Sequence, residues 1–286
     1  MVTKKTKSFK VDFYAVLIDG KRHRVSVRDL LLAAAENGHS DAYSLEEDSD
    51  EKFQLRSVVV TKNQSVIRGV FGRCRYNEKP VQGTDDGNEA DVELLPNHGL
   101  VQKNHFLFYP DRNLFVYQRN SAGSHYAKLQ HFLNVATEKP VLLEPILTRD
   151  SYARILGGKG AKTAEFSFIK PADVSLYKGT SLGDAMSVAS TANSATTKVK
   201  LSVGRTGGIL SLGTINGIID MARNGRARVA RVTLHEDSQP IDLIADRIAY
   251  TITVNMNSNR PDPEHMYACL ADAESKKRDD IKAFFG

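Results

Sequence analysis

Pairs of strand-forming segments joined by short polar turns constrain this chain more than any other feature. Residues 53–62 and 65–76 are rich in Val, Ile and Phe and are separated by two polar residues. Residues 105–109 and 114–118 form a second pair around the turn sequence at 110–113. Because so short a connection joins antiparallel neighbours, the sequence predicts sheets that are mainly antiparallel.

Several segments between these strands show the apolar spacing of helices. Ser, Thr and Asp favour helix starts, because their side chains accept hydrogen bonds from the first free backbone N–H groups. The expected capping residues are Ser26, Ser124, Thr214 and Asp262, and the last helix is expected to continue to Phe285. Before the first helix, residues 11–18 are expected to form a strand that ends at Asp19-Gly20.

Further strands are expected in the second half of the chain, at residues 141–147, 163–169, 198–204, 226–235 and 241–256. A short helix is expected at 151–156, and a loop or frayed helix end at the Ser/Thr/Ala-rich residues 187–197. Together the patterns predict an α+β fold of mainly antiparallel sheets with flanking helices and a long C-terminal helix. We expect two α+β domains, 1–147 and 148–286, with a single shared sheet as the alternative.

The composition is that of an ordinary globular protein, with 41% apolar and 26% charged residues among 286. The longest clean apolar run, residues 30–35, is far below the roughly 18 residues that suggest a transmembrane helix, so no membrane insertion is expected. Cys74 and Cys269 are the only cysteines, and no charged-then-apolar leader opens the chain. We therefore expect free thiols and a cytoplasmic location.

Positive charge is concentrated in two stretches, although the formal net charge is only +5. Residues 1–28 contain eight basic and two acidic residues, and residues 198–231 contain seven and one. Acidic residues gather at 41–51 and 85–93, which are expected to be solvated loops. Such segregation lets one face bind a polyanion while other surfaces keep the protein soluble. Basic residues scattered around the surface are the alternative interpretation.

The candidate DNA-binding residues come from both basic stretches and from a glycine-rich segment between them. They are Lys198, Lys200, Arg205, Arg226 and Arg228, with Lys159, Lys162, Arg22 and Arg24 as further contributors. Because side chains alternate along a strand, Arg226 and Arg228 are expected on one face and Arg231 on the other. The first five candidates are expected to line one phosphate-contacting surface.

Motifs for catalysis or metal binding are incomplete in this chain. Residues 157–163, GGKGAKT, lack a glycine and the preceding buried strand of a phosphate loop, and 179–183, GTSLG, lack the parallel sheet of a hydrolase. The eight histidines show no zinc-binding spacing. Asp242 and Asp246 lack the closely following lysine of many metal nucleases. We therefore expect no catalytic residue, no metal ligand and no cofactor.

Short motifs in the same order along most of the chain resemble one family of phage-exclusion proteins. The motifs are Phe13-Tyr14-Ala15, residues 105–108 (HFLF), 114–119 (LFVYQR), the helix at 124–135, 143–147 (LEPIL) and Tyr267-Ala268. In this layout the chain is similar to the family of the lambda exclusion protein RexA, and more distantly to DUF4868 proteins of the Kiwa defence system. The acidic loops and residues 187–197 depart from that layout.

The resemblance implies a cytoplasmic, dimeric protein of prophage or bacterial origin that binds DNA without strong sequence preference and acts against infecting phage. Together with the charge pattern, it predicts a non-enzymatic protein that binds double-stranded DNA through its phosphates. A homodimer and a second defence protein are the other expected partners. Two alternatives remain at this point: a metal-dependent defence nuclease, and a protein-binding phage sensor that does not bind DNA.

Overall fold

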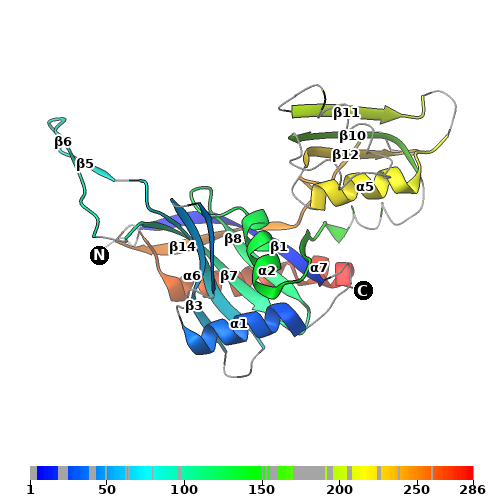
Figure 1. The fold of residues 1–286 in the computed structure, drawn as a ribbon. Coiled ribbons are helices and arrows are strands. Elements are labelled where there is room, and N and C mark those ends of the chain that lie inside the picture. Colours follow the sequence, from blue (N-terminus) through cyan, green and yellow to red (C-terminus); the bar gives the residue numbers. More distant parts are fainter. Residues whose placement is uncertain are drawn as a thin grey trace. The chain divides into compact units, whose positions relative to one another are not determined.

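The structure is a computed structural model (Figure 1). It describes residues 5–18, 25–38, 43–149, 151, 154, 160–169, 191, 196–204, 208–223 and 227–285, without residues 49, 62, 64, 79, 96, 97, 238 and 259. The fold is α+β, with antiparallel sheets and a helical C-terminus, as predicted. Among the described residues, no helix is long and apolar enough to cross a membrane.

The chain divides into two compact units, and each is made of two separate segments of the sequence. Unit 1 contains residues 1–143 and 249–276, and unit 2 contains residues 144–248 and 277–286. The predicted boundary at residue 147 lies close to the first crossing between the units. Residues 249–276 belong to unit 1, because residues 249–255 pair with residues 6–12 in the first strand.

Unit 1 is built on a nine-stranded sheet in the order β15-β14-β1-β8-β7-β4-β3-β2, with β9 also pairing with β1. The pairings along this order are antiparallel. The strands are β1 (Thr6–Ile18), β2 (Ser44–Asp48), β3 (Glu51–Val60), β4 (Ile67–Arg75), β7 (Leu100–Tyr109), β8 (Leu114–Arg119), β9 (Val141–Pro145), β14 (Ala249–Asn257) and β15 (Arg260–Pro261). Both strand pairs predicted from short connections, β3–β4 and β7–β8, are confirmed.

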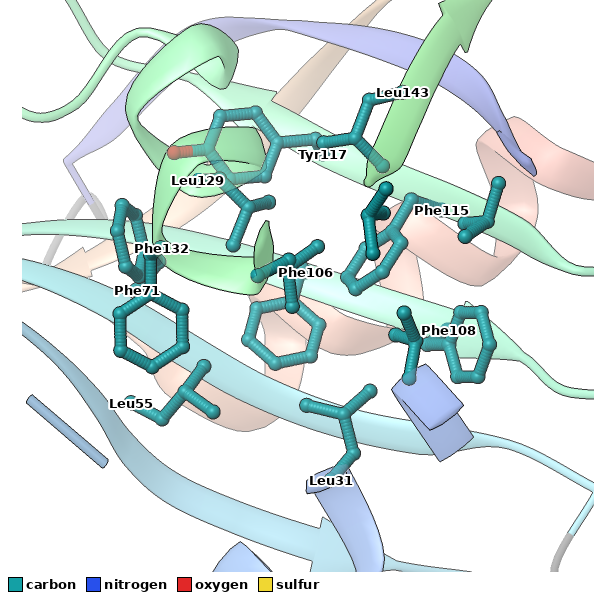
Figure 2. Packing of buried hydrophobic residues seen from close by; sticks show 14 of the residues in the cluster. Leu31, Leu55, Phe71, Phe106, Phe108, Phe115, Tyr117, Leu129, Phe132 and Leu143 are labelled. Carbon is teal, nitrogen blue, oxygen red and sulfur yellow. The ribbon is translucent and has the colours of Figure 1, made fainter. Parts of the chain in front are cut away.

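Helices cover both faces of this sheet. On one face, α1 (Val25–Asn37) and α2 (Tyr126–Thr137) enclose an aromatic core. Figure 2 shows Phe71 and Phe132 packed against each other within it, with ring centroids 5.4 Å apart. On the other face, the ring of His105 in β7 contacts Tyr267 of α6 (Pro263–Lys276). The sheet therefore forms the middle layer of unit 1.

Unit 2 contains a four-stranded antiparallel sheet with one apolar face. Its order is β11 (Thr196–Ser202), β10 (Ala161–Ile169), β12 (Ala227–Leu234) and β13 (Ile241–Asp242). Helix α5 (Leu212–Arg223) packs on this sheet, where Phe166, Ile218 and Val232 are buried. Unit 2 also contains α7 (Arg278–Phe285).

Two of the predicted elements are interrupted. The strand predicted at 241–256 is divided into β13 and β14, which belong to different sheets and different units. The long C-terminal helix is two helices, α6 and α7, separated at Lys277. In both cases a continuous apolar pattern crosses a point where the chain changes from one unit to the other, and periodicity alone does not reveal such a change.

Helix starts were predicted to within a few residues. Asp262 caps α6 as predicted, because its Oδ1 accepts a hydrogen bond from the N–H of His265 at 3.0 Å. The N-cap of α2 is His125 rather than Ser124, since the His125 ring accepts from the Ala127 N–H. At α5, Ser211 accepts from the N–H of Thr214, which lies inside the helix. Ser26 likewise lies inside α1, which begins at Val25.

A separate two-stranded ribbon in unit 1 consists of β5 (Val81–Gly83) and β6 (Glu89–Asp91) (Figure 1). All six of its strand residues are exposed. Its tip is held by local bonds, including one from Asn88 Nδ2 to Asp86 Oδ2 at 2.9 Å. The acidic residues at 85–91 are therefore exposed on a ribbon and its turn, rather than in the solvated loop predicted from their composition.

Candidate nucleic-acid interface

The clearest of the predicted DNA-binding residues lie on β11, at the edge of the unit 2 sheet. Lys198 and Lys200 are exposed, whereas Val199 and Leu201, which alternate with them, pack toward the core. This alternation is expected for an edge strand with one buried face. The two lysines therefore point to the open face of the sheet.

A row of alternating charges crosses this open face. The strand registers place Lys200 beside Glu165, Glu165 beside Arg231, and Arg231 beside Asp242. We call these four residues the charged row. Lys198 lies next to the row and forms an ion pair with Glu165 at 2.7 Å. At the other end, Arg231 Nε donates to Asp242 Oδ2 at 2.9 Å.

The neighbouring cations keep both carboxylates of the charged row ionised. The hydrogen bond from Lys198 lowers the pKa of Glu165, and the positive charges of Lys198, Arg231 and Lys200 lower it further. Partial burial opposes ionisation of Asp242, but hydrogen bonds from the Ala245 N–H and from Arg231 outweigh it, so its pKa is also lowered. At neutral pH the face thus presents three cations and two anions.

Arg231, which the sequence analysis did not include among the candidates, also lies on this face. Ala230 and Val232 are buried, so Arg231 points outward beside the lysines. A register shift between β10 and β12 at Ser167 and Phe168 interrupts the regular alternation near Arg228. The apolar alternation at positions 230, 232 and 234 is the sequence signal that could have identified Arg231.

Among the other candidates, Lys162 alone has a described side chain, and that side chain is engaged elsewhere. Lys162 is on β10, but its Nζ donates to the backbone carbonyl of Asp237 at 2.7 Å and so holds a turn. Arg228 is on β12, and its side chain lies outside the described part of the structure. The remaining candidates, Arg22, Arg24, Lys159, Arg205 and Arg226, also lie outside the described residues.

Comparison with family models places the chain in a family. The model of a family of unknown function (DUF6731) matches residues 4–276. The chain belongs to the DUF6731 family. The match covers nearly all of unit 1 and the larger segment of unit 2, residues 144–248. A comparison with curated proteins gives no match.

Possible metal ligands do not cluster in the described part of this DUF6731 chain, where no group of three or more His, Cys, Asp or Glu residues could hold an ion. The two aspartates considered for a nuclease have other bonds. Asp242 pairs with Arg231, and Asp246 accepts a hydrogen bond from the Ser151 hydroxyl at 2.9 Å. Residues 157–159 and 179–183, which contain most of the two glycine motifs, lie outside the described residues.

One cysteine of the DUF6731 chain lies beside a histidine, but their geometry does not suit nucleophilic catalysis. Cys269 Sγ is 3.6 Å from Nε2 of His265 on α6. The other ring nitrogen, Nδ1, accepts a hydrogen bond from the Asn255 N–H at 2.9 Å. A neutral His265 therefore carries its proton on Nε2 and cannot accept the thiol proton there. Burial and the charge of Asp272 also raise the pKa of Cys269.

Proposed function

We propose that this DUF6731 protein binds double-stranded DNA through the phosphate backbone, without sequence preference, and acts in the exclusion of infecting phage. The observation that carries the proposal is the open face of the unit 2 sheet, where Lys198, Lys200 and Arg231 lie on one surface. The phage context rests on the resemblance to the RexA family. A cytoplasmic location and a homodimer belong to the same proposal.

The spacing of these cations suits contacts with more than one phosphate. Lys198 and Lys200 are two residues apart on one strand, which separates them by about 7 Å. Arg231 is two strands away from Lys200, a distance of about 10 Å. Because Glu165 and Asp242 compensate two of the three charges, binding through this face is expected to be weak and strongly dependent on salt.

The test is DNA binding by the full chain as a function of salt, measured by fluorescence anisotropy. If all three cations contact phosphates, log K should fall with log salt with a slope of about −2.7, from roughly −0.9 per contact. In the double variant K198Q/K200Q the slope should become shallower by about 1.8. The matched control is K139Q, which removes an exposed lysine of unit 1.

An unchanged slope in the double variant would refute this surface as the binding site. Duplexes of unrelated sequence that compete unequally at fixed salt would refute sequence-independent binding. The role in phage exclusion is tested separately, by comparing plaque formation on cells that produce the wild type or the double variant. Equal protection by the two would disconnect this surface from defence.

A further inference from the structure

A second group of basic side chains lies on the sheet of unit 1, on the face opposite the aromatic core. It consists of Lys52 and Arg56 on β3 and Lys103 on β7, with β4 between the two strands. We call these three residues the β3–β7 basic cluster. Lys103 is far from Lys52 and Arg56 in the sequence, and the order of the strands places it near them.

The cluster centres on Gly72, where the middle strand has no side chain. A Cβ placed on Gly72 would lie 3.0 Å from Cδ of Arg56 and 3.4 Å from Cγ1 of Val101. Arg56 therefore lies across β4, in the space that a side chain at position 72 would occupy. Lys103 is in register with Gly72 and is two residues from Val101, so it emerges on the same face.

Arg56 retains unused hydrogen-bonding capacity. Its guanidinium has five N–H donors, and within the described part of the chain only Nη2 is engaged, by Gln54 Oε1. Its Nε is buried and has no partner among the described residues. No carboxylate of the described residues is within 4.0 Å of Arg56 or Lys103, whereas Lys52 pairs with Glu46 at 3.3 Å. Two of the three cations are thus available to an anion.

Lys52 and Arg56 also act together on the hydroxyl of Tyr76. A hydrogen bond with the Cys74 side chain and partial burial raise the pKa of the Tyr76 hydroxyl, and the charges of Lys52 and Arg56 act in the opposite direction. Cys74 is two residues from Gly72 on β4, which places it on the same face.

We propose that the β3–β7 basic cluster binds a phosphate group over Gly72. A guanidinium can donate two parallel hydrogen bonds to phosphate oxygens, and a lysine adds a mobile point charge. The phosphate belongs to a free small molecule or to a polynucleotide backbone. This site goes beyond the proposed function, because it uses other residues, in the other unit, and does not require DNA binding by unit 2.

The test is a titration of the isotope-labelled full chain with inorganic phosphate at constant ionic strength, followed by NMR. We expect saturable shifts of the Arg56 Nε–H and Gly72 amide resonances. The affinity should fall at least tenfold in K103Q and in R56Q, with the Gly72 amide as the readout in R56Q, and should be unchanged in K139Q. Chloride at the same ionic strength should give no saturable shift.

A variant at the glycine tests the geometry itself. In G72V the new side chain should displace Arg56 and abolish the phosphate-dependent shifts, and the remaining resonances report whether the sheet is intact. Because K103Q leaves position 72 unchanged, the proposal can still be tested if G72V does not fold. Absence of saturable shifts in the wild type, or equal shifts in K103Q, would refute the site.

The source of the phosphate is distinguished by two further probes, a nucleoside monophosphate and a short DNA duplex. Either probe should displace inorganic phosphate and shift the same resonances, and the tighter of the two identifies the source. If neither displaces inorganic phosphate, both proposed sources are wrong. The variant K198Q/K200Q should retain the inorganic phosphate shifts, so failure of DNA binding by unit 2 can be distinguished from failure of this site.

Discussion

Replacing Asn104 should lower the free energy of unfolding of unit 1, because this one side chain bonds two backbone groups. Asn104 is fully buried in β7. Its Nδ2 donates to the backbone carbonyl of Gln118 at 2.9 Å, and its Oδ1 accepts from the N–H of Ser124 at 2.7 Å. These bonds tie the segment before α2 to the β7–β8 hairpin. In N104A both buried backbone groups lose their partner.

The expected cost follows from these two groups. A buried donor or acceptor without a partner costs about 1–3 kcal/mol, so we expect N104A to lose about 3 kcal/mol. For a unit of this size that corresponds to a fall in the melting temperature of about 6–12 °C. Tyrosine fluorescence reports this unfolding, because the chain has no Trp and eight of its ten tyrosines belong to unit 1.

The matched control is N88A at the exposed tip of the β5–β6 ribbon, where we expect a change within about 0.5 kcal/mol. N104D adds a test in which the direction of the pH dependence of stability is predicted. A neutral aspartic acid can still donate to the Gln118 carbonyl, but an aspartate cannot, and burial raises its pKa. The stability of N104D should therefore be higher at low pH and be lost as pH rises through that raised pKa. A cost of N104A below about 1 kcal/mol would refute the assignment of these two bonds.

The remaining predictions concern unit 2 and the cysteines. In E165Q the lysines of β11 lose their neighbouring carboxylate, so DNA should bind about two- to fivefold tighter at low salt. The control is E36Q on α1, and an equal gain in affinity there would contradict this prediction. Because the folded state lowers the pKa of Asp242, its contribution to stability is complete above the ordinary aspartate range and is lost as pH falls through the lowered value. The free energy of unfolding in urea, followed by unit 2 NMR resonances, should therefore fall less steeply at acid pH in D242N than in the wild type. Parallel pH profiles for the two proteins would contradict this prediction. C74A/C269A should bind DNA like the wild type in the anisotropy assay, since both thiols are free, and loss of binding by a folded variant would show otherwise.

The local part of the fold could be predicted from the sequence. The β3–β4 and β7–β8 pairs have short connections, so each turn and its two strands are visible in one window. The pairing of β1 with β14 joins residues 6–12 to residues 249–255, and no local pattern contains that information. For the same reason, the sequence predicts one continuous strand where the chain passes from β13 in unit 2 to β14 in unit 1.

The candidate sites likewise have a local part, which the sequence reveals, and a part that depends on strand pairing. Lys198 and Lys200 were predicted correctly as neighbours on one exposed strand face, because alternation along a strand is local. The pairing of Lys198 with Glu165 and of Arg231 with Asp242 depends on registers between strands. The placement of Arg56 and Lys103 on the strands that flank Gly72 depends on the order of three strands, which the sequence does not disclose.

The insertion of residues 144–248 between the two segments of unit 1 also fixes an order of events during synthesis. β1 is made first, yet residues 6–12 pair with a strand that is made about 130 residues after β8. At typical translation rates this interval lasts on the order of 10 s, and during it this part of β1 has an open edge. Open edges invite pairing with other chains, and lysines discourage it. Lys7 and Lys10, both exposed within this segment, are side chains of the kind that discourage such pairing.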